Sequence, residues 1–173
     1  MKITLAEALP LRAAIMRRIS ELVEERNAVS TITFVPGEVE NIEHPVRKVD
    51  EITGEIEEAR ADFRKLDVLM ARANVTETLE WEGKSYTIIE AIELAKQMRS
   101  EVAELKRLAG RKKEEIQRGF GGSTTITRTL YEPEEMRKKA IELEKKATRL
   151  SQLIDKKNYQ VEIDFPEAEK YLG

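Results

Sequence analysis

The feature that most constrains the fold is a regular spacing of apolar residues along two long segments. In both segments the apolar positions follow one another in alternating steps of three and four residues. This repeat places one apolar stripe along an α-helix, because residues three and four apart share a face. The stripes consist of Val49, Ile52, Ile56, Ala59, Phe63, Leu66, Met70 and Ala73, and of Met136, Ala140, Leu143, Ala147, Leu150 and Ile154. A helix with one narrow stripe has to bury it against another helix, so the sequence predicts helix-on-helix packing.

Helix-start signals add two further helices. Residues 4–7 and 87–90 both read Thr-x-x-Glu, the capping box in which each side chain satisfies a free backbone amide of the other residue. Pro133 suits a first helical position, whereas Pro10 is expected to kink its helix or to delay its regular part. The sequence therefore predicts four helices, over residues about 4–27, 46–74, 87–118 and 133–158.

Short alternating runs rich in β-branched residues lie between and after these helices. They predict strands at about 31–35, 78–81, 124–130 and 159–165, with a tight turn at Gly83. In an up-down-up-down arrangement the first and third of these runs lie at the same end, where they could pair. The predicted fold is mainly α. It is an elongated antiparallel four-helix or coiled-coil-type bundle, with short strands or hairpins at its ends, and forms a single domain over residues 1–173.

Charge is dense but balanced. Charged residues make up 36% of the chain, against about 25% in an average protein, yet the net charge is only −3. The segment Asp50–Glu58 carries acids and no base, whereas Lys106–Arg118 is mostly basic. The short connection at Gly83 predicts that the second and third helices are antiparallel neighbours, with these two blocks facing each other.

The composition excludes several kinds of chemistry. Without cysteine there is no disulfide, thiolate zinc site, iron–sulfur cluster or cysteine nucleophile. The single histidine, His44, does not form the Glu-x-x-His spacing of di-iron helical bundles and is expected in a loop. We therefore expect no catalytic residue, metal ligand or cofactor, and an enzyme is not favoured. The apolar runs are too short for a transmembrane segment or a signal peptide, which makes a cytoplasmic location the default.

A glycine-rich loop at residues 119–122 lies among basic residues and is a candidate anion-binding site. Its basic neighbours are Arg111, Lys112, Lys113, Arg118 and Arg128. The loop does not match the phosphate-binding pattern G-x-x-x-x-G-K-[ST], and it follows the negative end of a helix. The favoured interpretation is that acids within the bundle neutralise these bases. A nucleic-acid or phosphate-binding face is the alternative.

Several short motifs resemble a small, uncharacterised bacterial family labelled septicolysin-like. The motifs are Leu5-Ala-Glu-Ala-Leu9, Leu11-Arg-Ala13, Arg17-Arg-Ile19, Arg72-Ala-Asn74 with Thr76 and Thr78, Thr87, Ile126-Thr-Arg-Thr-Leu130 and Asn158-Tyr159. The chain departs from that family in the sequence Gly-Phe-Gly-Gly at 119–122 and in an acidic tail that contains Pro166. The resemblance implies a helical fold with no assigned role and names no site residue, although the family label suggests a lytic protein.

The leading functional hypothesis is a non-enzymatic structural or interaction protein that self-associates or binds a protein partner. It rests on the two apolar stripes and on strand-like segments, such as 124–130, whose edges could pair between chains. The first alternative is a helical protein that binds anions or nucleic acid through the basic cluster. The second, suggested by the family label, is a membrane-acting protein.

Overall fold

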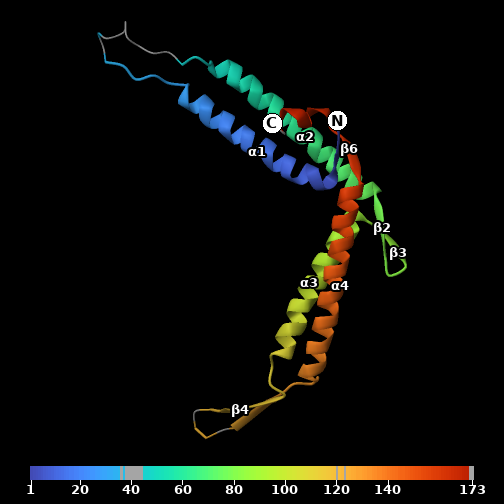
Figure 1. Cartoon of the computed structure of the whole chain (residues 1–173). Coiled ribbons are helices and arrows are strands. Elements are labelled where there is room, and N and C mark those ends of the chain that lie inside the picture. The colour runs from blue at the N-terminus through green and yellow to red at the C-terminus, as the bar shows by residue number, and fades with distance from the viewer. Residues whose placement is uncertain (36, 38–44, 120, 123, 172–173) are drawn as a thin grey trace. The chain divides into compact units, whose positions relative to one another are not determined.

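The computed structural model describes residues 1–35, 37, 45–119, 121–122 and 124–171. The described part is mainly helical, as predicted, with four α-helices and three pairs of antiparallel strands (Figure 1). The helices are α1 (Leu5–Ala28), α2 (Val49–Thr76), α3 (Ile88–Ala109) and α4 (Pro133–Gln160). The strands are β1 (Lys2–Thr4), β2 (Thr78–Trp81), β3 (Lys84–Thr87), β4 (Glu114–Arg118), β5 (Thr124–Arg128) and β6 (Glu162–Asp164). A short 3₁₀ helix, η2, covers Pro166–Lys170.

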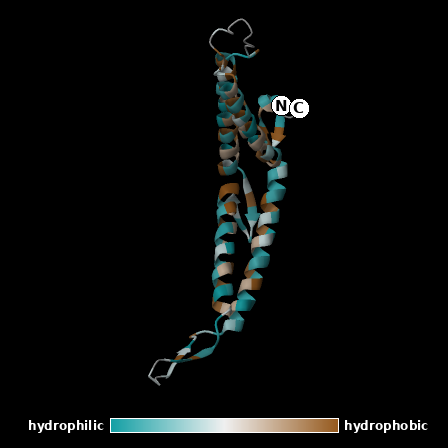
Figure 2. Cartoon of the chain, turned by 90° about the vertical axis from the view of Figure 1, so that its left-hand side faces the viewer, coloured by the Kyte–Doolittle hydropathy of each residue, from teal (hydrophilic) through white to brown (hydrophobic). Residues whose placement is uncertain are grey.

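The chain divides into two compact units, where the sequence predicted a single domain. Unit 1 contains Met1–Asn74 and Asn158–Gly173, and unit 2 contains Val75–Lys157. Each unit is built around one pair of helices. Figure 2 shows hydrophilic residues along much of each helix, with apolar residues at intervals between them.

In unit 1, α1 and α2 pack antiparallel. Arg26 near the end of α1 bonds to Thr53 near the start of α2, whereas Arg12 near the start of α1 pairs with Asp67 at 2.5 Å. Between them Leu22, Ile52 and Ile56 form a buried cluster.

A small two-stranded sheet closes unit 1. Strand β1 pairs with β6, and Ile3 lies opposite Ile163. The backbone amide of Leu5 donates to Val161 O at 2.9 Å, and that of Phe165 donates to Met1 O at 2.8 Å. Because Phe165 is fully buried, the C-terminal segment forms part of the core of this unit.

In unit 2, α3 and α4 pack antiparallel along an alanine-rich seam. Arg99 bonds to Ser151, and Lys106 pairs with Glu144 at 2.8 Å, so the contacts advance along α3 as they go back along α4. The buried residues of the two helices are Ile88, Ala91, Ala95, Val102, Leu105, Ala109, Ala140, Ala147, Leu150 and Ile154. The hairpin β2–β3 turns at Glu82 and Gly83, both with positive φ, which is the type I′ geometry that favours glycine.

Both predicted capping boxes are present. Thr4 and Thr87 each accept a hydrogen bond from the backbone amide of Glu7 and Glu90 respectively, and each glutamate accepts one from the backbone amide of its threonine. Each glutamate carboxylate also accepts a hydrogen bond from the hydroxyl of its threonine, and the hydroxyl and backbone-amide bonds together lower the pKa of both glutamates. α1 begins at Leu5 and includes Pro10, so its start is not delayed by the proline.

Four predicted elements differ from the structure. The third helix ends at Ala109 rather than near 118, because Gly110 ends the helix and residues 114–118 form strand β4. Residues 31–35 form no strand, and β5 pairs with β4 instead. The strand run 124–130 is shortened to Thr124–Arg128, and the run 159–165 to Glu162–Asp164, whose partner β1 the sequence did not predict.

The two charged blocks also find other partners than predicted. In the acidic block, Glu55 pairs with Arg18 and Arg47, and Glu58 pairs with Lys170. In the basic block, Lys106 pairs with Glu144. These partners lie within the same unit as the block, because antiparallel pairing joins α2 to α1 and α3 to α4.

We predict that Leu150→Ala destabilises unit 2 by about 2–5 kcal/mol, because Leu150 is fully buried in the α3–α4 seam. Leu153→Ala on the same helix is the matched control. The Leu153 side chain is 37% exposed, so the loss is expected to stay below about 1 kcal/mol. Urea unfolding followed by circular dichroism gives both values, and equal losses would contradict the burial pattern.

Candidate functional site

The basic cluster predicted from the sequence lies at the connection between α3 and α4. Arg111, Lys112 and Lys113 follow α3, whereas Arg118 ends β4 and Arg128 ends β5. Lys113 pairs with Glu132 and Arg128 pairs with Glu114, the latter at 2.6 Å. Among the described residues, Arg111, Lys112 and Arg118 form no ion pair. Lys113 and Arg128 therefore pair with acids of their own unit, and not with the acidic block of α2 as the sequence predicted.

The β4–β5 hairpin is the most exposed element of unit 2. Every residue of both strands is exposed to solvent, on both faces of the hairpin. Ile116 lies directly opposite Ile126, and the two side chains are 64% and 60% exposed. Leu130, just beyond the hairpin, is 97% exposed. An isolated two-stranded hairpin with no apolar cover is at best marginally stable in water, so this one depends on its anchors or on a partner.

Contacts at its base hold the hairpin to the helices of unit 2. The Tyr131 hydroxyl donates to Leu108 O near the end of α3 at 3.0 Å. The backbone amide of Thr129 donates to Lys113 O at 3.0 Å, and Lys113 Nζ donates to Tyr131 O at 3.2 Å. These contacts fix where the hairpin leaves the helix pair and leave its strands uncovered.

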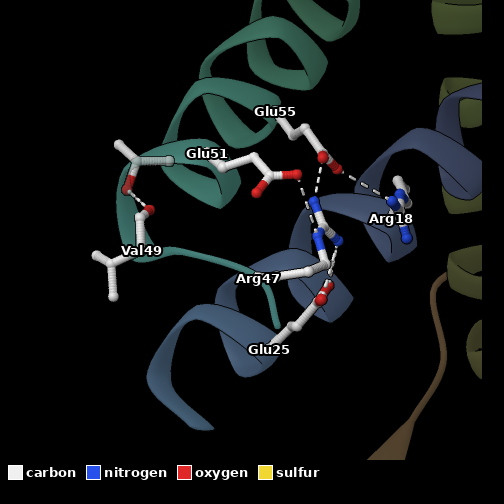
Figure 3. A network of polar contacts seen from close by, with 7 residues as sticks. Arg18, Glu25, Arg47, Val49, Glu51 and Glu55 are labelled. Atoms are coloured by element: carbon white, nitrogen blue, oxygen red, sulfur yellow. Dashed lines mark hydrogen bonds and ion pairs between the residues drawn. The ribbon is translucent and has the colours of Figure 1, made fainter. Parts of the chain in front are cut away.

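In unit 1 one arginine, Arg47, lies among carboxylates from the end of α1 and the start of α2. Figure 3 shows the Arg47 guanidinium between the carboxylates of Glu25, Glu51 and Glu55, with Arg18 on the far side of Glu55. Loss of hydration disfavours the Arg47 cation, but the three carboxylates outweigh it and raise the pKa of Arg47. The network joins the end of α1 to the start of α2, which is a structural role.

The C-terminal segment of unit 1 is fixed by a second cluster around Asp62, the one charged residue buried within the described part. Tyr171 Oη donates to Asp62 Oδ2 at 2.8 Å, and Lys170 Nζ donates to the same oxygen at 3.1 Å. Lys65 pairs with Glu167 at 2.5 Å. Burial, and then the hydrogen bond to Asp62, raise the pKa of Tyr171 above its usual range.

A pocket of about 390 Å³ lies between α1, α2 and this C-terminal segment. Its charged lining residues are Arg18, Glu55, Glu58 and Lys170, and its other lining residues are Ala14, Leu22, Ala59 and Tyr171. Arg18 pairs with Glu55 and Lys170 pairs with Glu58. Because the charges satisfy one another, the lining presents no unpaired group that would select a ligand.

The other candidates from the sequence were a metal site near His44 and a membrane-acting helix. His44 lies outside the described residues. Among the residues that the structure describes, no three histidine, aspartate or glutamate side chains are placed to hold a metal ion. In the same part of the chain, no helix is both long and apolar enough to span a membrane.

Comparison with known proteins adds a fold and no function. No protein-family model and no curated protein matches the chain. The chain is similar to the crystal structure of a functionally unknown conserved protein from Corynebacterium diphtheriae, with a TM-score of 0.62 and 23% identity. The match covers 95% of this chain and 100% of the other. The likeness shows a shared fold, and the septicolysin-like resemblance stays a prediction.

We predict that Tyr171 keeps its proton well above a pH of about 10, the usual pKa of a tyrosine side chain. Asp62→Ala removes the acceptor of the Tyr171 hydroxyl, so the pKa of Tyr171 should fall toward that value. Tyrosinate absorbance measured against pH shows this as the loss of a late-titrating group. Asp67→Ala, which removes a carboxylate paired with Arg12 instead, is the control and should leave the titration unchanged. A wild-type curve without a late-titrating tyrosine would contradict the Tyr171–Asp62 hydrogen bond.

Proposed function

We propose that this protein is a non-enzymatic structural or interaction protein that self-associates, with the β4–β5 hairpin as its contact element. The observation that carries the proposal is the exposure of every residue in both strands. Exposed strand edges are a template for pairing with another chain, and a bare two-stranded hairpin gains stability when a partner covers it. The exposed pair Ile116 and Ile126 adds apolar surface to that contact.

The helix pairs fit the role of supports for this contact. We propose that each is a coiled-coil-type antiparallel hairpin. In support, α3 buries Ile88, Ala91 and Ala95, then Val102, Leu105 and Ala109, in steps that follow the seven-residue repeat. The cross-helix contacts from Arg99 to Ser151 and from Lys106 to Glu144 hold α3 beside α4. The hydrogen bond from the Tyr131 hydroxyl to Leu108 O holds the base of the hairpin to the end of α3.

The arrangement of charge supports a binding role over catalysis. The charged groups that line the unit 1 pocket pair with one another, and the Asp62 cluster binds the chain's own C-terminal segment. A catalytic acid or base needs an approach to substrate, which these partners occupy. The proposal includes a cytoplasmic location, with which the dense mixed charge is compatible.

A second candidate function is binding of nucleic acid or another polyanion. One observation favours it, namely that Arg111, Lys112 and Arg118 lie close together in sequence around the hairpin without ion-pair partners among the described residues. Unpaired cations next to an exposed hairpin form a surface that phosphates could contact. Self-association ranks first because it also accounts for the exposed isoleucines.

We predict that the wild-type protein self-associates, so that its mass rises above 19.9 kDa as concentration increases. Ile116→Lys should shift the equilibrium toward the monomer, because it places a charge in the centre of the contact. Sedimentation velocity over a wide concentration range measures both. Ile141→Lys is the matched control, since Ile141 is 47% exposed on α4, and it should behave like the wild type. A wild-type mass that stays at the monomer value at every concentration would overturn the proposal.

The polyanion alternative predicts binding to a single-stranded oligonucleotide that weakens steeply as salt increases. Lys112→Glu should weaken that binding and reduce its salt dependence, since one phosphate contact is lost. Fluorescence anisotropy gives both quantities. Lys138→Glu carries the same change of charge to an exposed position on α4 and serves as the control. Absence of binding at low salt would exclude this alternative.

A further inference from the structure

Strand β4 carries a charge pattern that is complementary to itself when reversed. Its sequence is Glu114-Glu115-Ile116-Gln117-Arg118, with an acid at one end, a base at the other and isoleucine in the middle. Within the described part of the chain β4 pairs with β5 alone, which leaves its other edge without a strand. That edge offers backbone groups for one more ladder.

We infer that two copies of this chain join through the free edges of their β4 strands, antiparallel, about a twofold axis at Ile116. The inference rests on the proposed self-association and specifies its surface and register. In this register Glu114 lies opposite the second copy's Arg118, and Arg118 lies opposite the second copy's Glu114. Glu115 lies opposite Gln117, so no like charges meet. Directly opposite side chains on paired strands are close enough to attract or repel one another.

The same register aligns the isoleucines. Ile116 and Ile126 are direct partners in the hairpin and therefore point to the same face. Joining two β4 strands at Ile116 makes a four-stranded sheet with four isoleucines in one row across that face. A sheet of three or more strands with an apolar stripe is more stable than a lone hairpin. This accounts for two exposed isoleucines on an element that has no core of its own.

Other ways of joining the hairpins lack this match. Moving the axis to Glu115 sets two Glu115 side chains opposite each other and places Ile116 opposite Glu114. Moving it to Gln117 places Ile116 opposite Arg118. A parallel β4 pair sets Glu114 against Glu114, and pairing through β5 about Ile126 brings Thr124 opposite Arg128 without opposite charges. The antiparallel β4 pair centred on Ile116 is thus favoured by both charge and apolar contact.

The register can be tested with two oppositely charged variants. Arg118→Glu gives β4 an acid at both ends. The double variant Glu114→Arg with Arg128→Glu gives β4 a base at both ends and keeps an ion pair inside the hairpin, with its signs reversed. All three positions are exposed, so the fold should be retained, which circular dichroism checks. In either variant alone the two equivalent contacts change from attractive to repulsive.

We expect the dissociation constant of each variant alone to rise about tenfold over that of the wild type. Mixing the two variants in equal amounts should restore wild-type affinity, because every acid then faces a base. Sedimentation velocity measures the dissociation constant of the wild type, of each variant alone and of their mixture. Lys138→Glu is the control for a change of net charge alone. Restoration on mixing supports the register, since a merely structural defect would not be repaired by a second defective chain.

Two results overturn the inference, and they are distinguishable from each other. If the wild type is monomeric at every concentration, the proposed self-association fails and the register fails with it. If the wild type self-associates but the variants match it and mixing changes nothing, self-association stands and its surface lies elsewhere. The β5 edge and the apolar segment 31–35 are then the next surfaces to test.

Discussion

Burial of one apolar stripe per helix is the constraint on which the rest of this structure depends. A narrow apolar stripe can be buried against one neighbouring helix. Each unit accordingly contains one helix pair, α1 with α2 and α3 with α4. The seam of α3 and α4 contains alanines such as Ala95 and Ala147, which allow close approach but bury little area. Such a pair has no deep interior, and functional groups can only be arranged on surfaces.

Local ion pairs then decide how the ends of the helix pairs are held. Arg47 gathers three carboxylates where α1 meets α2, and Asp62 fixes the C-terminal segment of the same unit. These contacts pair opposite charges within unit 1. The β4–β5 hairpin differs in two ways. Among the described residues Arg118 has no ion-pair partner, and the side chains of Ile116 and Ile126 are exposed to solvent.

The sequence predicted those parts of the fold that follow from periodicity and capping. The stripe from Met136 to Ile154 and the capping box at Thr87 appear as expected, since helical spacing and a Thr-x-x-Glu signal are local properties. The helix predicted to run to about 118 failed because Ile116 fits a helical spacing, while Gly110 had already ended the helix. Strand β1 was missed because three residues carry too little pattern, and its pairing with β6 joins the two ends of the chain.

The candidate site was predicted less well than the fold. The basic residues between Arg111 and Arg128 were identified from the sequence. Which of them form ion pairs depends on the positions of Glu114 and Glu132, and these contacts form only when the chain folds. The opposite charges of the acidic and basic blocks are visible in the sequence, yet composition does not specify which helices become neighbours. The self-complementary order of β4 was readable in the sequence, but it gained meaning only when the segment proved to be a strand with a free edge.

The most direct test of the account is amide hydrogen exchange of the two hairpins of unit 2 at low and high protein concentration. The account predicts that protection of residues 114–118 rises with concentration, because the outer amides of β4 become bonded in the dimer. Residues 78–81 of β2 should exchange at the same rate throughout, since the hairpin β2–β3 packs Leu79 within its own unit. Equal exchange of residues 114–118 at all concentrations would contradict the claim that the hairpin is where two chains meet.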